Sequence, residues 1–216
     1  GIETRYSVFN EENAVFYGNR DDKQELASME TRNIIYSEEA EKLAIQSCRN
    51  AIEDWGGKLD DITHVLSVSC TGMVVPGLEF KVARALGLKT TVQRLGINFM
   101  GCFGGVSVLK TAKALAAEDP NRRILCVCTE LCSLHFAPDL RTDNIVAGAI
   151  FADGSASAVV GGNPRAGERP IYELFKSGSA AIPNSVDKML WDLGDHGWKL
   201  GLSVDIPELI HQSIRQ

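Results

Sequence analysis

The chain has 216 residues, of which 44% are hydrophobic and 23% are charged, and its formal net charge is −6. This length is enough for one domain with a sizeable core. The negative charge argues against nucleic acid or an anionic membrane as a partner. The sequence has no run of about 18 apolar residues, so no membrane span is expected. No secretory signal is visible, so the thiols are expected to be reduced and the location cytoplasmic.

The cysteines offer no metal-binding pattern. No CxxC pair occurs, and only His135 follows a cysteine at ligand spacing, so a metal site is not expected. Cys126 and Cys128 are expected to share one face of a strand. The six cysteines are Cys48, Cys70, Cys102, Cys126, Cys128 and Cys132.

The first part of the chain contains one clear helix. Residues 1–33 are polar, and residues 10–22 are predicted to be a loop with at most one helical turn. Ser37 is a plausible N-cap for the helix that follows, and Gly56-Gly57 is its predicted end. Its apolar stripe is Ala40, Leu43, Ala44, Cys48, Ala51 and Ile52.

Strands and helices alternate after this helix, which predicts an α/β fold with a largely buried sheet. The predicted strands span residues 63–70, 92–98, 123–132 and the segment that ends near residue 162. The predicted helices span residues 78–86, 106–118 and 144–149. Beyond a linker at residues 163–169, residues 170–179 are predicted to form a strand whose hairpin partner is residues 197–203. Asp205 is predicted to cap a last helix with Pro207 in its first turn.

One cysteine stands out because it lies in a glycine-rich turn before a helix. Unpaired N–H groups and the helix dipole favour a thiolate at such a position, and the pKa of Cys102 is expected to fall below the free value of about 8.5. Gly101, Gly104 and Gly105 leave room for a substrate. The local pattern supports a second interpretation equally, a buried cysteine that packs as a small hydrophobe.

The segment Gly101–Gly105 and the helix after it resemble the nucleophile region of type III polyketide synthases, the chalcone synthase family of the thiolase superfamily. The resemblance extends over essentially the whole chain, and Glu130–Leu134 is closer to the microbial and fungal branch than to the plant enzymes. The other matching segments are Gly1-Ile2 with Arg5-Tyr6, Asp61–Val65, Pro76-Gly77, Gly87-Leu88, Cys128–Ser133, Phe151–Ala156 and Asp205–Pro207.

The resemblance implies a thiolase-like α/β/α/β/α layered fold made of two similar halves. Residues 1–162 are expected to form the first half, which carries the nucleophilic cysteine. Residues 163–169 are the expected linker, and residues 170–216 are the expected start of the second half. The family's catalytic His and Asn belong to that second half, beyond the position that matches Gln216. None of the four histidines, His64, His135, His196 and His211, matches the family's histidine motif.

The resemblance also implies a reaction. An acyl group moves from coenzyme A to Cys102, and decarboxylation of malonyl-CoA supplies the enolate that extends it. Pyrones, resorcinols or related aromatic polyketides are the expected products. Coenzyme A thioesters are the expected substrates, with no further cofactor. Glu3 stands where the family usually has a lysine that binds coenzyme A, and Arg5 is interpreted as structural.

Several residues match pocket positions of the family. Phe151 matches a phenylalanine that gates the acyl pocket, although an ordinary core aromatic is the alternative. Leu200 matches a second gating phenylalanine, and Trp191 is a candidate to refill the space that the smaller leucine leaves. His135 matches a residue that is commonly Thr in the plant enzymes, the alternative being a partly exposed loop histidine.

Four further matches concern small residues and the dimer. Cys70, Thr71 and Cys132 match small residues that line the family's pocket, with plain burial as the alternative for both cysteines. The small side chains at Cys70 and Cys132 favour long-chain starters. Val75 matches a methionine that reaches into the partner subunit's cavity, which implies a homodimer.

Two other functions remain open at this point. One is a condensing enzyme like ketoacyl synthase III, which Phe103 and the segment Phe151–Gly154 disfavour. The other is a non-catalytic half that only completes a dimer.

Overall fold

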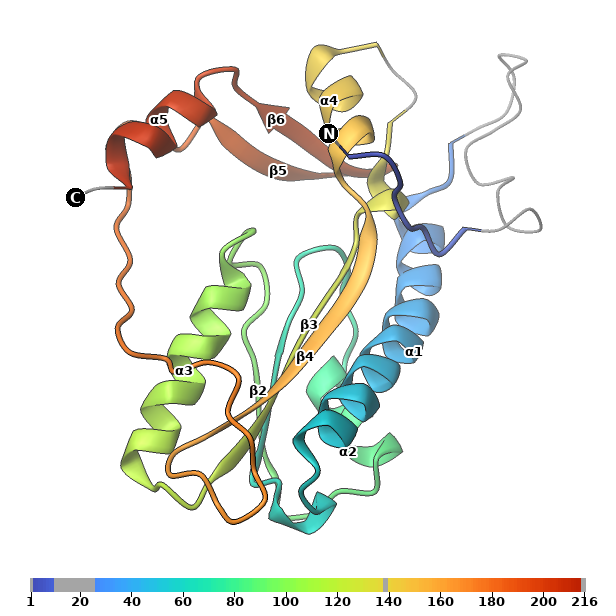
Figure 1. Ribbon diagram of the computed structural model, residues 1–216. Helices are drawn as coiled ribbons and strands as arrows, with labels where there is room; N and C mark the ends of the chain where they lie inside the picture. The colour runs from blue at the N-terminus through green and yellow to red at the C-terminus, as the bar shows by residue number, and fades with distance from the viewer. Residues whose placement is uncertain (1, 10–25, 138–139, 215–216) are drawn as a thin grey trace. The chain divides into compact units, whose positions relative to one another are not determined.

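The computed structural model describes residues 2–9, 26–137 and 140–214 (Figure 1). The loop predicted at residues 10–22 therefore lies outside the described residues. The described elements are α1 (Met29–Trp55), η2 (Leu59–Asp61), β1 (His64–Val68), α2 (Leu78–Ala85), β2 (Gln93–Gly96), α3 (Gly104–Glu118), β3 (Arg123–Leu131), η3 (Cys132–His135), α4 (Thr142–Ile150), β4 (Asp153–Gly161), β5 (Met189–Gly194), β6 (Gly197–Leu202) and α5 (Ile206–Ser213). No described helix is both long and apolar enough to cross a bilayer.

The contacts divide the chain into two compact units, which are described separately. The sheet unit comprises Asn33–Leu131 and Asp153–Ser177. The hairpin unit comprises Gly1–Arg32, Cys132–Ala152 and Gly178–Gln216.

The sheet unit is built on four strands in the order β2-β1-β3-β4. β1 is parallel to both β2 and β3, so that Leu66 lies opposite Leu95 on one side and Cys126 on the other. β4 is antiparallel to β3. The carboxyl ends of the three parallel strands therefore lie at one edge of the sheet, and the segments that follow β1 and β2 begin there.

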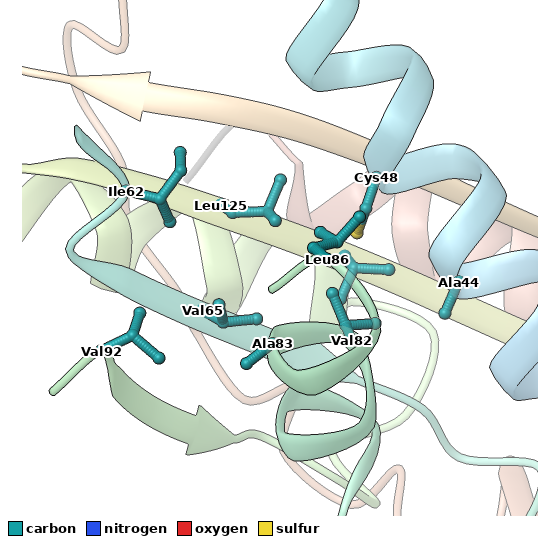
Figure 2. Close-up of a cluster of buried hydrophobic side chains, with 10 residues drawn as sticks. Ala44, Cys48, Ile62, Val65, Val82, Ala83, Leu86, Val92 and Leu125 are labelled. Atoms are coloured by element: carbon teal, nitrogen blue, oxygen red, sulfur yellow. The ribbon is translucent and has the colours of Figure 1, made fainter. Parts of the chain in front are cut away.

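Helices cover both faces of this sheet, as the alternation of side chains along a strand requires. On one face, Val65 and Leu125 pack against α1 and α2, and Figure 2 shows this cluster with Val82 and Cys48. On the other face, α3 packs Val108, Ala112 and Ala116 against the sheet. Cys126 and Cys128 both point to this second face, as predicted. The α/β class predicted from the sequence is confirmed.

Helix α1 begins nine residues earlier than predicted. Ser37 lies inside the helix, and the N-cap role belongs to Ser28, whose hydroxyl accepts the N–H of Thr31 at 3.2 Å. Tyr36 is buried one turn before Ala40 and extends the apolar stripe. The predicted end is confirmed: Gly56 follows Trp55, has a φ of 71° and donates its N–H to Ile52 at 3.0 Å.

Hydroxyl groups line the contact of α1 with β4. Ser47 Oγ lies 2.8 Å from Ser155 Oγ and 2.7 Å from Ser157 Oγ. Thr129 Oγ1 on β3 lies 2.8 Å from the same Ser155 oxygen, and Cys48 Sγ lies 3.3 Å from Ser157 Oγ. Polar atoms at this helix–sheet contact thus bond to one another, as partly buried polar groups must.

The segment after β4 is fixed to the sheet unit by a buried arginine. Arg123, at the start of β3, donates from Nε and Nη2 to the two oxygens of Glu168, each at 2.7 Å. Trp55 Nε1 on α1 donates to the same carboxylate at 2.8 Å. Arg123 also bonds to the carbonyl of Asn163 at 2.9 Å. The predicted linker at residues 163–169 is therefore held in place by directed bonds.

The hairpin unit contains the antiparallel pair β5 and β6, joined at Gly194 and Gly197 by a two-residue turn. The strand predicted at residues 170–179 is wrong, because this segment has no regular secondary structure and the partner of β6 is β5. The last helix, α5, starts as predicted after Asp205, with Pro207 in its first turn.

Candidate active site

The turn that carries Cys102 lies between β2 and α3 at the carboxyl edge of the sheet (Figure 1). Two residues of this turn have left-handed backbone, Phe99 with a φ of 58° and Gly101 with a φ of 88°. Phe99 donates its N–H to the Ser69 carbonyl at 3.1 Å, which ties the turn to the end of β1. A positive φ at a residue with a side chain is uncommon and often accompanies a functional site.

Helix α3 starts at Gly104, two residues earlier than predicted. A Cβ at Gly104 would lie 2.5 Å from Val68 Cγ2, so only glycine allows the helix to pack this closely on β1. At Gly105 a Cβ would meet Cys128 Sγ at 3.6 Å, an ordinary contact. Gly104 therefore sets the distance of the helix start from the sheet.

Cys102 is exposed to solvent, so the interpretation as a buried small hydrophobe is wrong. The prediction that the pKa of the Cys102 thiol is lowered is also wrong in the structure described. Partial desolvation of the sulfur raises the pKa of the Cys102 thiol, and the charge of Glu130 raises it further. The backbone N–H of Cys102 opposes this rise but does not outweigh it. The helix start places the thiol without making it acidic.

Cys70 contacts the turn rather than open solvent. Its sulfur accepts the N–H of Gly101 at 3.3 Å, immediately before Cys102. Cys70 is half-buried, and desolvation raises the pKa of its thiol. The predicted pocket residue Cys70 therefore also supports the candidate nucleophile.

A half-buried carboxylate lies behind this turn. Both oxygens of Glu130 accept the N–H of Cys70, at 2.9 and 3.0 Å, and Oε2 accepts the hydroxyl of Thr71 at 2.7 Å. Thr71 is 1% exposed, and its hydroxyl also accepts the N–H of Leu131 at 2.9 Å. Burial raises the pKa of Glu130, and its hydrogen bonds oppose that rise. Thr71 thus bonds within the protein, and its predicted contact with substrate remains a prediction.

The hairpin unit contains a small hollow that is partly open to solvent. It brings together three predicted pocket residues, Phe151, His135 and Leu200, and the candidate Trp191. Its other lining residues are Phe136, Ala137, Asn144 and Ala147. Phe151 at the end of α4 therefore borders an open space, in contrast to an ordinary core aromatic.

His135 is a buried residue of this hollow, with 6% exposure, so the alternative of a partly exposed loop histidine is wrong. Its Nδ1 accepts the backbone N–H of Trp198 at 3.3 Å, which leaves Nε2 to carry the proton in the neutral ring. The edge of its ring meets Trp191 at 5.5 Å and Trp198 at 6.2 Å between centroids. His135 and Trp191 thus form an aromatic part of the lining of the hollow.

The remaining predicted residues lie in different places. Cys132 is half-buried in η3, so it is not plainly buried. Val75 is 95% exposed in the loop before α2. Arg5 donates to the carbonyl of Phe151 at 3.5 Å, which supports its structural interpretation. Within the described residues, no group of three or more His, Cys, Asp or Glu side chains is placed to hold a metal ion.

Two features of the site were not predicted from the sequence. The sequence analysis includes Glu130 only as part of a motif, although an acidic residue at the end of an apolar strand is itself a signal, because a carboxylate is rarely withdrawn from solvent without a role. The contact of His135 with Trp198 has no sequence signal, since 63 residues separate the two.

Comparison with known proteins agrees with this geometry. The family model named "Chalcone and stilbene synthases, N-terminal domain" matches residues 1–164. The chain belongs to the chalcone and stilbene synthase family. The resemblance to type III polyketide synthases is therefore confirmed.

Two relatives illustrate the membership in this family. The protein named "Probable polyketide synthase 1" from Dictyostelium discoideum is 48% identical over 172 residues, which are 80% of this chain and 6% of that protein. The crystal structure of the C-terminal type III polyketide synthase domain of Steely1, a type I/III hybrid from Dictyostelium, matches with a TM-score of 0.83 and 46% identity. The match covers 85% of this chain and 51% of that domain. This chalcone synthase-like chain thus has a thiolase-like fold and spans about half of the solved domain.

Proposed function

We propose that this chain supplies the nucleophile of a type III polyketide synthase, which loads an acyl group from acyl-CoA onto Cys102 and extends it with malonyl-CoA. The observation that supports the proposal is the position of Cys102, exposed in a tight turn directly before α3. Membership in the chalcone and stilbene synthase family supports the same reaction.

The proposed chemistry balances without a redox or metal step. The Cys102 sulfur attacks the carbonyl carbon of the acyl-CoA, a new C–S bond forms, and coenzyme A leaves as its thiol with the proton that Cys102 gave up. Malonyl-CoA then loses CO₂, and the electrons of the broken C–C bond form an enolate. The enolate carbon attacks the Cys102 thioester, and the cysteine thiolate leaves. Because the pKa of the Cys102 thiol is raised, the proposal needs a base that accepts its proton.

The hollow of the hairpin unit is the proposed acyl-binding surface. Phe151, His135 and Leu200 line it together, as expected for pocket residues. Six of its eight lining residues are apolar or aromatic, which suits an acyl chain or a growing polyketide better than a charged ligand. Cys70, Thr71 and Cys132 complete the proposed set of substrate contacts. Pyrones, resorcinols or related aromatic polyketides are the proposed products.

The test is acyl transfer by the full-length protein. The enzyme is incubated with a panel of acyl-CoA starters and malonyl-CoA, and mass spectrometry measures both the products and the mass of the peptide that contains Cys102. We expect an acyl adduct on Cys102 and polyketide products. Cys102→Ala should lose the adduct and reduce turnover on the order of a thousandfold or more, because no second nucleophile replaces the thiol.

Cys48→Ala is the matched control. Cys48 is buried in the core, where desolvation raises the pKa of its thiol to about 11, so its loss should leave acyl transfer intact. An adduct on another cysteine with none on Cys102 would overturn the nucleophile assignment. Acylation from an acyl carrier protein but from no acyl-CoA would favour the ketoacyl synthase III-like reaction.

A further inference from the structure

We infer that Glu130 is a positioning residue for Cys102: its carboxylate fixes the end of β1, and Cys70 at that end holds the turn that carries Cys102. The inference rests on the proposed function and deepens it, since it names a residue that prepares the same thiol.

The link from Glu130 to the turn consists of two successive hydrogen bonds. Glu130 lies near the end of β3, which runs parallel to β1 with Val68 opposite Cys128. Just beyond β1, the N–H of Cys70 points at the carboxylate, with both oxygens within 3.0 Å. The sulfur of Cys70 in turn accepts the N–H of Gly101 at 3.3 Å, and the next residue is Cys102.

The carboxylate is itself held from several sides, as a positioning group must be. The Thr71 hydroxyl donates to it at 2.7 Å, and the Ser69 hydroxyl lies 3.4 Å from Oε2. Tyr36 on α1 donates to that Ser69 hydroxyl at 2.7 Å. The direct donors all follow β1, and Tyr36 connects one of them, Ser69, to α1, so a shift of Glu130 would break several bonds at the end of β1.

The charge of Glu130 acts on the same thiol. The titratable groups that face the carboxylate in the described residues are Tyr36 on α1, Cys70 after β1, Cys102 in the turn and Cys128 on β3. For each of these groups the negative charge disfavours ionisation. An effect on Cys102 that follows the charge alone is therefore separable from an effect that follows the hydrogen bonds.

Two substitutions in the full-length protein make this separation. Glu130→Gln keeps an oxygen that accepts the Cys70 N–H but removes the charge, whereas Glu130→Ala removes both. The alkylation rate of Cys102 by iodoacetamide is measured from pH 6 to 10 by mass spectrometry of its peptide. In Glu130→Gln the midpoint of the pH profile should shift to lower pH, and the rate at pH 7 should rise about threefold.

Acyl loading of Cys102 gives the second readout. Glu130→Ala should lower the loading rate about tenfold, because the turn loses its anchor, and Glu130→Gln should restore most of that loss. Glu118→Gln is the matched control for charge: Glu118 ends α3, about 21 Å along the helix from its start, and its substitution should leave the profile unchanged.

The inference is overturned if the alanine variant loads acyl groups as fast as the wild type, or if the glutamine and alanine variants load them equally slowly. If the alanine variant does not fold, acyl loading by Glu130→Gln decides: a loss of about tenfold overturns the inference, because the amide oxygen still accepts the Cys70 N–H, and loading near the wild-type rate supports it. Failure of the proposed function is distinguishable: the wild type would then load no acyl group, while a changed rate of Cys102 alkylation at pH 10 in Glu130→Ala, but not in Glu130→Gln, would still support the positioning role of Glu130.

Discussion

Glu168 has the largest downward pKa shift among the described carboxylates whose values are resolved. Hydrogen bonds from Arg123 lower the pKa of Glu168 to about 2, and the N–H of Arg165 and the Trp55 indole add to the effect. Its partner Arg123 is almost fully buried. A buried arginine that loses its carboxylate is left with an uncompensated charge, so this pair contributes more than an exposed ion pair.

This environment predicts a pH dependence of stability. A depressed pKa in the folded state stabilises the fold above the ordinary pKa of the carboxyl, and that stability is lost as the pH falls from about 4.5 to about 2. At pH 6 the free energy of unfolding of Glu168→Gln should therefore be roughly 2 kcal/mol lower than that of the wild type. This difference should shrink toward zero near pH 2. Urea titration at several pH values measures it.

Glu118→Gln is the comparison for this experiment, because Glu118 pairs with Arg122 on an exposed helix end. Its effect on unfolding should be small at every pH. A constant difference between wild type and Glu168→Gln across the whole pH range would contradict the role assigned to the carboxylate charge.

At the scale of elements, helix α3 begins with two adjacent glycines that differ in their surroundings. Gly104 faces Val68 on β1, whereas Gly105 has room for a methyl group. The valine is β-branched and packed in the core, so it cannot move aside without disturbing the sheet. The position of the turn that carries Cys102 follows from this packing.

Gly104→Ala should lower the free energy of unfolding by about 1–3 kcal/mol, because the added methyl group forces α3 away from β1. Gly105→Ala should be neutral or stabilising by up to about 1 kcal/mol, because alanine favours a helix. Chemical denaturation of both variants measures the difference. Equal effects at the two positions would show that helix propensity, and not the contact with Val68, determines the change in the free energy of unfolding.

The elements that the sequence predicts correctly are those with strong local signals. Gly56 and Gly87 mark the ends of α1 and α2, and Pro207 marks the start of α5, each through its backbone conformation alone. The start of α1 was missed because Ser37 has the chemistry of an N-cap, while burial of Tyr36 and Arg32 extends the helix before it. The strand expected at residues 170–179 was wrong because periodicity says nothing of a partner, whereas β5 lies one two-residue turn from β6.

The candidate site was predictable in part for the same reason. The turn and helix that expose Cys102 are local, and the family resemblance supplied Phe151, His135 and Leu200, which line one hollow. The pKa of Cys102 was not predictable, because desolvation and the charge of Glu130 depend on a strand 28 residues away in the sequence.

At the scale of the whole molecule, Val75 is the residue that bears on assembly. It is an apolar side chain with 95% exposure, in a loop that the family resemblance places at the subunit contact. Membership in the chalcone and stilbene synthase family supports the proposal of a homodimer. An exposed valine in this position would gain free energy by burial against a partner.

Val75→Glu should shift the full-length protein from dimer toward monomer, because a carboxylate cannot enter an apolar interface without a partner charge. Light scattering coupled to size-exclusion chromatography measures the mass at several concentrations. Val186→Glu is the control, since Val186 is 90% exposed in a different segment and should not change the mass. A wild-type protein that is monomeric at all concentrations would refute the proposed homodimer.

The hydroxyl contacts of Ser47 with Ser155 and Ser157 have a consequence for how uniquely the chain folds. Alanine and valine side chains would tolerate a sliding of α1 along the sheet, since apolar contact has little direction. Hydroxyl oxygens paired at 2.7–2.8 Å would not tolerate such sliding. A displacement of α1 by one turn would leave several of them without hydrogen-bond partners at once. This hydroxyl cluster therefore fixes the position of α1 along the strands.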